Sequence, residues 1–365
     1  MKPRAIAISV AAIVVLAFPA GASAAKGKDK GEDVTVMSRN VYLGADLSPA
    51  IEAPDIPSAI DGAGAIFNDV VRTNFPERAI PLAKEIEKAK PDLVGLQEVA
   101  NWQTQTPSDL GGPPIGPGTV PASTPFQDFL AILEGELSSK YRVVATQDEF
   151  VGELPADVNG VDEPGTVAGE DMDVRLTMRD VILARKGVKA SKVKMAHYET
   201  RFETAVGGVP IGADRGWIST QAQVGDAKFK FVNTHLEAFG DDTIREAQAK
   251  ELIDAALKGK GQVVLVGDLN SGLKKPHKIK GTDQLAFKAL DKFGMFDAGA
   301  IQSCCYPAEL NDPKFKFDHT VDHVLTKPKV KVDDAFVTGN DKGEITPSGV
   351  WPSDHGGVVS TILIP

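Results

Sequence analysis

The chain has 365 residues, of which 42% are hydrophobic and 25% are charged, and its formal net charge is −10. This balance is typical of a folded protein and excludes disorder as the main state of the chain. The acidic charge also argues against a protein that binds polyanions by bulk electrostatics, so any phosphate chemistry has to rely on a local site or a bound cation.

The N-terminus predicts a secretory signal peptide. Lys2 and Arg4 precede an apolar run over residues 5–20, and Ala22-Ser23-Ala24 supplies small residues at the spacing that a signal peptidase accepts. The alternative is a retained membrane anchor, but the run is short for a bilayer span and no other stretch approaches ~20 apolar residues. The predicted organisation is a signal peptide over residues 1–24, a flexible leader over 25–32 and one domain over 33–365.

Cleavage of the predicted signal peptide during export would produce the mature chain. After cleavage behind Ala24 the net charge changes from −10 to −12, because the signal carries Lys2 and Arg4 and no acidic residue. We expect a secreted or cell-envelope protein that is monomeric and has no stable membrane insertion.

Apolar runs that fit buried strands alternate along the mature chain with segments of helical periodicity. Strands are expected at residues 34–41, 91–99, 141–146, 180–185, 217–224, 228–234, 262–267, 321–326 and 357–364. Helices are expected at residues 77–90, 126–137 and 241–257. The alternation predicts an α/β protein, and the closely spaced strands indicate antiparallel hairpins within it.

Two long segments are predicted to be loops. Residues 101–125 are rich in Pro and Gly, and residues 148–173 are acidic. The plain interpretation of both is a solvated surface insertion, and the acidic composition favours it for the second. The first leaves directly from a charged strand end, so it is also a candidate functional loop.

The only cysteines, Cys304 and Cys305, are neighbours. A bridge between them closes a small ring, so it cannot hold the fold together as a long-loop disulfide does. A vicinal disulfide, two free thiols and an interchain bridge all stay open. Redox catalysis is disfavoured because the chain has no C-x-x-C spacing.

Polar side chains stand at the ends of the predicted buried strands. They are Asn40, Glu98, His235, Asp268 with Asn270, Asp322, and Asp354 with His355. Each alone can be explained as a turn former, a helix cap or a structural histidine. Because α/β sheets assemble their sites at strand ends, so many in one chain indicate a shared site.

The chemistry of this set is coherent. Its carboxylates and amides are hard oxygen ligands that suit Mg²⁺, Mn²⁺ or Ca²⁺, whereas zinc would call for more His or Cys at ligand spacing. His235 and His355 can exchange protons or donate to an anion near neutral pH. A cation that neutralises phosphate, beside a base that prepares water, predicts hydrolysis of a phosphate ester.

In chain order, the stretches SRNV, LVGLQEV, NTHLE, VGDLNS, VDHVL and PSDHGG resemble the motif series of the endonuclease/exonuclease/phosphatase superfamily, which has the deoxyribonuclease-I-like fold. The series spans residues 34–364, and NVYLGADL, which begins at Asn40, resembles a group of exported bacterial members. The resemblance implies a four-layered α/β sandwich, in which two mixed β-sheets pack face to face with helices outside. It also places an active site at one edge.

The resemblance implies a metal site as well. Glu98 would be the principal ligand, with Asn40 nearby and Asp354 sharing metal or water contacts. The implied cofactor is Mg²⁺, with Mn²⁺ and Ca²⁺ as alternatives.

The remaining residues receive catalytic roles from the same resemblance. His355 would act as the general base or the proton carrier to the attacking water, oriented by Asp322. Asp268 and Asn270 would position the nucleophile and the scissile phosphate, and His235 would donate to a phosphate oxygen.

Neighbouring residues are given other roles. His319 and His323 are predicted to be structural or surface histidines, and Asp46 to be a capping residue. A carboxylate that would orient His235 is not obvious from the motifs, and Asp180 is the candidate.

The substrate is left open, because the fold hosts enzymes for DNA, RNA, inositol phosphates and sphingomyelin. A nuclease would benefit from a basic groove, and residues 273–281 are the one basic segment well placed for it, with a solvated loop as the alternative interpretation. A binding module that has lost catalysis is a further class, which the joint presence of the site residues argues against. The prediction is a metal-dependent hydrolase of a phosphodiester or phosphomonoester, with nucleic acid and phospholipid headgroups as candidate partners.

Overall fold

The computed structural model describes residues 31–109, 120–161, 166–206, 209–272 and 283–365. The predicted signal peptide, most of the predicted leader and the basic segment 273–281 lie outside these ranges, so the domain boundaries and the segment's role stay predictions. Across the described ranges, no helix is long and apolar enough to span a membrane.

The larger sheet has eight strands, and residues at their ends form one half of the site. Its strands are β1 (Glu32–Asn40), β2 (Leu93–Gln97), β3 (Asn101–Gln105), β4 (Thr124–Asp128), β5 (Tyr141–Ala156), β6 (Met172–Arg185), β15 (Lys331–Thr338) and β16 (Gly357–Ile364). The order is β15-β16-β1-β2-β6-β3-β4, with β5 paired to β6. Because β1 and β2 are parallel and their outer neighbours antiparallel, the sheet is mixed.

The smaller sheet has six strands in the order β13-β14-β12-β11-β10-β7. They are β7 (Lys189–His197), β10 (Gly216–Val224), β11 (Ala227–His235), β12 (Gln262–Asp268), β13 (Phe296–Asp297) and β14 (Asp322–Lys327). Here β11 and β12 are the parallel pair, and the other pairs are antiparallel. A separate hairpin joins β8 (Phe202–Val206) to β9 (Val209–Ala213).

The two sheets share a buried apolar core, in which Val36 and Leu93 of the larger sheet lie with Phe231 and Val264 of the smaller one. One polar side chain crosses this core. Asn233 of β11 donates from Nδ2 to the Leu96 and Val181 carbonyls, and its Oδ1 accepts from Gln97 Nε2 at 2.6 Å. A Cβ at Gly95 would overlap that amide oxygen, so glycine is required where the sheets approach.

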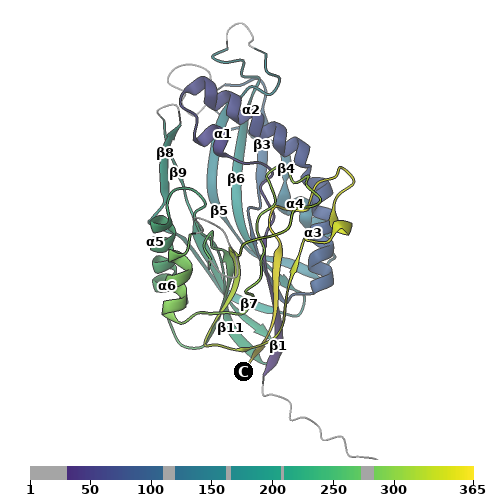
Figure 1. Ribbon diagram of the computed structural model, residues 1–365, viewed down its shortest axis with the longest axis vertical. Helices are drawn as coiled ribbons and strands as arrows, with labels where there is room; N and C mark the ends of the chain where they lie inside the picture. The colour runs from purple at the N-terminus through teal and green to yellow at the C-terminus, as the bar shows by residue number, and fades with distance from the viewer. Residues whose placement is uncertain (1–30, 110–119, 162–165, 207–208, 273–282) are drawn as a thin grey trace, which may run out of the picture. The chain divides into compact units, whose positions relative to one another are not determined.

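Helices cover the outer face of each sheet. On the larger sheet they are α1 (Ser48–Ile51), α2 (Ile56–Thr73), α3 (Phe75–Ala89) and α4 (Phe129–Glu136), and on the smaller sheet α5 (Asp242–Leu252) and α6 (Leu285–Phe293). In Figure 1, α5 and α6 run side by side, and α2 continues into α3. A short 3₁₀ turn, η2 (Lys342–Glu344), follows β15. The predicted four-layered α/β sandwich is therefore confirmed.

Two predicted helices have different bounds. The helix expected at 126–137 begins only at Phe129, because the residues before it pair with β3, and Asp128 Oδ1 then caps the helix by accepting from the Leu130 and Ala131 amides. The helix expected at 241–257 ends as α5 at Leu252 and continues as a π-helical turn, η1 (Ile253–Leu257).

The two predicted loops contain strands. Residues 101–125 hold β3 and the start of β4, and residues 148–173 hold most of β5, which pairs with β6 along its whole length. The acidic residues of β5 conceal its alternation in the sequence, because Asp148 is exposed but its neighbour Glu149 is buried. Residues 110–119 and 162–165 of these segments lie outside the described ranges.

The helix α2 is absent from the sequence prediction, and it contains Gly62 and Gly64, which have low helix propensity. Both glycines have a packing reason: a Cβ at Gly64 would overlap the Asp157 carbonyl, and one at Gly62 the Pro49 carbonyl. The helix is capped at its start by Asp55, whose side chain accepts from Ser58 N at 2.9 Å.

Candidate active site

Three predicted residues meet at one edge of the smaller sheet because of strand register. His235 ends β11 and is paired with Asp268, the last residue of the parallel strand β12. Asp268 is in turn paired with Asp322, the first residue of the antiparallel strand β14. All three side chains are buried.

The larger sheet brings its own residues to the same edge. Asn40 ends β1 beside Gln97 of the parallel strand β2, and Glu98 follows directly. The Asn40 amide joins the two sheets, since its Nδ2 donates to Glu98 Oε1 at 3.0 Å and to Asp268 Oδ2 at 3.1 Å. Residues more than two hundred positions apart in the sequence therefore form one cluster.

Asp322 and His355 form a buried pair at the centre of the cluster. His355 Nδ1 donates to Asp322 Oδ2 at 2.9 Å, and the Ser303 hydroxyl donates to the same oxygen at 2.7 Å. The proton on Nδ1 is thereby fixed, and Nε2 faces Asp268 Oδ2 at 3.7 Å and Asp354 Oδ1 at 4.0 Å. Burial lowers the pKa of His355, but the surrounding carboxylates, Asp322 first, outweigh it and hold this pKa well above its usual value.

His235 is held in the opposite tautomer. Its Nδ1 lies 3.0 Å from Arg215 Nη1, which can only donate, so Nδ1 accepts and the proton sits on Nε2. That nitrogen is 3.6 Å from Asp268 Oδ2, which can accept its proton, whereas Asn270 Nδ2, 3.2 Å away, is also a donor and instead donates to the Leu236 carbonyl at 3.0 Å. Burial, with the positive charges of Arg215 and His355, holds the pKa of His235 well below its usual value, so His235 is a neutral proton donor.

The residue that orients His235 is therefore Arg215 rather than Asp180. The Arg215 guanidinium is itself held by Glu237, at 3.3 and 3.4 Å. Asp180 is fully buried, and neither of its carboxylate oxygens has a hydrogen-bond partner among the described residues.

Glu98 has a constrained geometry that suits a metal ligand. Its φ is 57°, a left-handed backbone conformation that few non-glycine residues adopt. Its Oε2 accepts from Leu43 N at 2.9 Å while its Oε1 faces Asn40. Asn40 directs its NH₂ to the carboxylates because its Oδ1 accepts from Tyr42 N at 2.9 Å, so its role as a direct metal ligand stays a prediction.

The crowding of carboxylates fits a hard divalent cation. Burial raises the pKa of Asp354 to about 6, with Glu98 adding to the effect, and burial raises the pKa of Asp268 to about 7, with Asp322 adding. A bound cation stabilises the charged form of such buried carboxylates and therefore lowers their pKa values again. The oxygen donors of Glu98 and Asp354 line the same cavity and would hold the ion.

The sequence matches the profile of the Endonuclease/Exonuclease/phosphatase family over residues 71–355. The chain belongs to this family. Its name covers nucleases and phosphatases, so the chain is a member of a family of phosphoric ester hydrolases. Among curated proteins, none matches this chain in sequence.

Solved structures share the fold of this family member. A family protein from Bacteroides thetaiotaomicron is 15% identical with a TM-score of 0.53, covering 92% of this chain and 99% of that one. A mannosyl-6-phosphatase from the same organism is 14% identical with a TM-score of 0.51, covering 90% and 99%. A family protein from Bacteroides vulgatus is 15% identical with a TM-score of 0.50, covering 92% and 100%.

Two buried arginines fix the loops that carry the site in this family member. Arg78 donates to the carbonyls of Val41 at 2.8 Å and Pro352 at 2.9 Å, which joins the loop after β1 to the segment before His355. Arg39 donates to the His355 carbonyl and pairs with Glu85 at 3.0 Å. Burial lowers the pKa of Arg78 to about 10, and it stays charged at neutral pH.

A cavity of about 250 Å³ opens beside the carboxylates. Its charged lining residues are Asp46, Glu98, Arg215 and Asp354. The rest of the lining is mostly apolar, and a second cavity of about 100 Å³ shares Leu47, Ile51 and Phe150 with the first. The site therefore continues into an apolar groove.

The residues that sequence reasoning missed are Arg215, Ser303 and Ser353. Ser353 Oγ donates to the Asn40 carbonyl at 2.8 Å and accepts from His355 N at 3.2 Å. By contrast His323 is structural as predicted: its two ring nitrogens contact Asp297 and the Ser271 carbonyl, both at 3.0 Å.

Proposed function

We propose that this protein is a divalent-metal-dependent hydrolase of phosphate esters. The observation that carries the proposal is a matched pair of histidines about one carboxylate: His355 Nε2 and His235 Nε2 lie 3.7 and 3.6 Å from Asp268 Oδ2. One imidazole is held by a carboxylate and the other by a guanidinium, so the environments push their pKa values apart. Such separation gives one site an imidazole that can carry a proton, His355, and a neutral imidazole that donates a hydrogen bond, His235.

The residues act on a phosphate placed between them. Water attacks phosphorus, and the bond from phosphorus to the leaving oxygen breaks, so that the leaving group departs as an oxyanion and takes a proton from solvent. Asp268 with Asn270 orients the attacking water. His355 Nε2 accepts the proton from water, with Asp322 holding Nδ1, and His235 Nε2–H donates to a phosphate oxygen as its charge grows.

Mg²⁺ is the proposed cation, with Mn²⁺ or Ca²⁺ as alternatives, because the available donors are carboxylate oxygens. When bound by Glu98 and Asp354 it would neutralise charge on the phosphate and on the carboxylates. His355 depends on this, since its Nε2 is free to accept a proton only when the surrounding negative charge is offset.

The apolar groove favours a phosphate ester with an apolar substituent as the substrate, rather than a nucleic acid. A nucleic acid would need further cations along its backbone, but among the described residues that line the two cavities Arg215 is the only basic one, and it is already paired with Glu237. Apolar side chains such as Leu47, Ile51 and Phe150 instead offer burial to an alkyl or aryl substituent. Nuclease activity remains the second candidate, for which segment 273–281 is the motivating feature.

Hydrolysis of bis-p-nitrophenyl phosphate tests the proposal. We expect turnover with Mg²⁺, loss of turnover in EDTA, and recovery when Mg²⁺ is added in excess. Turnover that EDTA does not change would contradict metal dependence, and the absence of turnover under all conditions would indicate the non-catalytic binding module.

We also propose that the protein is exported. The N-terminal charge and apolar run motivate this, and N-terminal sequencing of protein recovered from the producing cells tests it. The expected first residue is Ala25, whereas a chain that begins at Met1 outside the cell would contradict the cleavage.

A further inference from the structure

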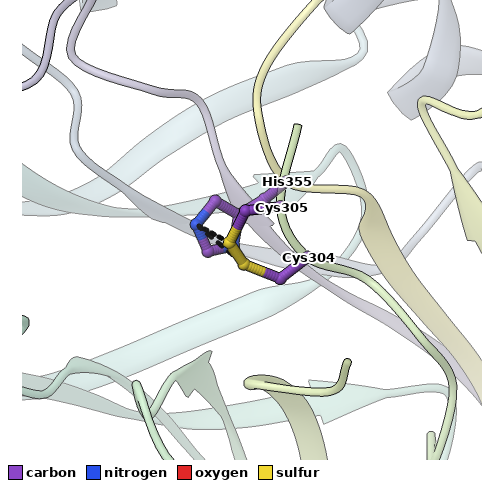
Figure 2. Close-up of side chains that lie close together, drawn as sticks. All are labelled: Cys304, Cys305 and His355. Carbon is purple, nitrogen blue, oxygen red and sulfur yellow. Dashed lines mark hydrogen bonds between the residues drawn. A yellow bond between two sulfur atoms is a disulfide. The ribbon is translucent and has the colours of Figure 1, made fainter. Parts of the chain in front are cut away.

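The vicinal cysteines lie against the catalytic imidazole rather than at a remote surface. Cys304 and Cys305, joined by a disulfide in the structure, place their sulfurs 3.8 and 3.7 Å from His355 Nε2. Figure 2 shows both sulfur atoms beside the ring. Cys305 Sγ is also 3.8 Å from Nε2 of a second histidine, His319, whose backbone pairs with Cys304. His355 Nε2 thus lies beside both sulfurs, and His319 Nε2 lies beside the sulfur of Cys305.

Both histidines are oriented in the same way. His355 Nδ1 donates to Asp322 at 2.9 Å, and His319 Nδ1 lies 2.8 Å from Asp318 Oδ1. In each ring the carboxylate fixes Nδ1 and leaves Nε2 directed at sulfur. Zinc-binding histidines have this arrangement, in which the nitrogen that does not ligate the metal donates to a carboxylate.

The distances agree with a shared ion. A sulfur and a nitrogen bound to one tetrahedral Zn²⁺ lie about 3.6 Å apart, given the usual Zn–S and Zn–N bond lengths. Three of the four sulfur-to-nitrogen pairs in this cluster lie 3.7 to 3.8 Å apart. Ligand atoms of Cys304, Cys305 and His355 also all lie within 4.8 Å of one another. His319 is not part of that group, so its ring has to move toward it, and the two sulfurs have to separate after reduction, before four ligands can surround one ion.

We propose that the reduced Cys304–Cys305 pair, with His319 and His355, binds Zn²⁺ as a Cys₂His₂ site. Formation needs an external dithiol: its two thiols are oxidised to a disulfide while the Cys304–Cys305 disulfide is reduced to two thiols. Zn²⁺ then displaces one proton from each thiol, and the thiolates ligate it. This site is made of soft and borderline donors, and so differs from the hard oxygen site of Glu98 and Asp354.

The consequence for catalysis rests on the proposed function. His355 Nε2 cannot ligate zinc and accept a proton at the same time, so the zinc-bound protein is inactive. Reduction alone leaves His355 free, and zinc alone finds no thiolates in the oxidised protein. Inhibition therefore requires both a reductant and zinc.

Metal binding can be measured without reference to activity. The full mature chain is treated with a dithiol, freed of it under argon, and titrated with Co²⁺ and then Zn²⁺. We expect the reduced protein to bind one Co²⁺ with a thiolate-to-cobalt charge-transfer band that Zn²⁺ abolishes, and the oxidised protein to show no such band. A reduced protein without the band would overturn the proposal.

Two variants separate this site from the oxygen site. Cys304→Ser/Cys305→Ser should lose the band while its fold, followed by circular dichroism, is unchanged. His319→Asn should lower zinc affinity at least ~10-fold, as loss of one ligand does, and keep the basal Mg²⁺-dependent hydrolysis, because His319 is outside the proposed catalytic set. An unchanged affinity in His319→Asn would overturn the four-ligand assignment.

Activity supplies the last comparison. Micromolar zinc should inhibit the reduced wild type at least ~10-fold, with Mg²⁺ in excess, and spare both the oxidised wild type and the cysteine double variant. Equal inhibition of all three forms would place zinc at the oxygen site and contradict the link to His355. If no form hydrolyses any ester, the proposed function is wrong, but the cobalt band still shows whether the zinc site exists.

Discussion

His235 Nδ1 lies 3.0 Å from the guanidinium of Arg215, and this contact decides which nitrogen of the imidazole carries the proton. An arginine cannot accept a hydrogen bond, so His235 is fixed as a neutral donor through Nε2. The same guanidinium is paired with Glu237, so its position does not depend on the substrate. The hydrogen-bond donor of the proposed site is thus oriented by a residue that need not touch the phosphate.

Replacement of Arg215 tests this positioning role. Arg215→Lys keeps the positive charge but loses the fork that reaches both Glu237 and His235, so we expect kcat to fall on the order of 10-fold with little change in KM. Nitrogen NMR of His235 is the decisive readout: the wild type should show the Nε2–H tautomer, and the variant a mixture. A variant with the wild-type tautomer would contradict the assignment.

The base and the orienting carboxylate are tested by truncation. His355→Ala and Asp268→Ala should each lower kcat for bis-p-nitrophenyl phosphate by at least ~10²-fold, which is the range for loss of a general base or a key electrostatic group. His197→Ala is the matched control, because His197 is exposed on β7 and lies outside the cluster. A near-normal rate in either site variant would contradict a catalytic role for the residue replaced in it.

The strand-end pattern predicts this site well where strands are parallel. Carboxyl ends of parallel neighbours meet at one edge, so Asn40 and Glu98 meet on the larger sheet as His235 and Asp268 do on the smaller. Asp322 and His355 also enter at the start of antiparallel strands and are found because they stand in a motif, whereas such a residue outside the motifs is overlooked. Arg215 directly precedes β10. Because Trp217 of β10 is paired with Thr234 of the antiparallel strand β11, the start of β10 lies beside the end of β11, and Arg215 reaches His235 there. A register assignment for the predicted hairpin at 217–234 is the signal that would have found it.

Long-range loop contacts are not predictable in this way. Ser303, Cys304 and Cys305 come from the segment between β13 and β14, which has no regular periodicity, and their place beside His355 depends on tertiary packing. Arg39 and Arg78, which hold the loops of the site in place, could not be predicted from the sequence either. Charged residues usually lie at the surface, and a buried arginine is an exception.

Asp180 makes stability depend on pH. Burial, with Glu98 and Asp268 nearby, holds the pKa of Asp180 well above its usual value, although Arg215 acts in the opposite direction. The folded state then binds a proton that the unfolded state has released above its own pKa of about 4, so stability falls as pH rises from that point. Asp180→Asn removes this loss and should stabilise the metal-free protein by about 1–3 kcal/mol at pH 8, with no gain below pH ~4.

Urea unfolding in EDTA at the two pH values measures the Asp180 effect. Asp254→Asn is the control, since Asp254 is 70% exposed in a surface ion pair and its replacement should change stability by less than ~0.5 kcal/mol. A variant that gains equally at both pH values, or loses stability at pH 8, would show that the carboxyl is not protonated in the folded protein.

The apolar groove predicts a dependence of rate on substrate chain length. Each methylene that the groove removes from water contributes about 0.8 kcal/mol, or about fourfold in kcat/KM, until the apolar lining is covered. The series of methyl, ethyl, propyl and butyl p-nitrophenyl phosphates should therefore rise stepwise. Phe150→Ala should flatten the rise, because Phe150 lines both cavities, whereas Val193→Ala, at an exposed position of β7, should leave it intact. Equal kcat/KM values across the series in the wild type would contradict binding of the alkyl group in the groove. A thymidine diester hydrolysed faster than the butyl ester would favour nuclease activity instead.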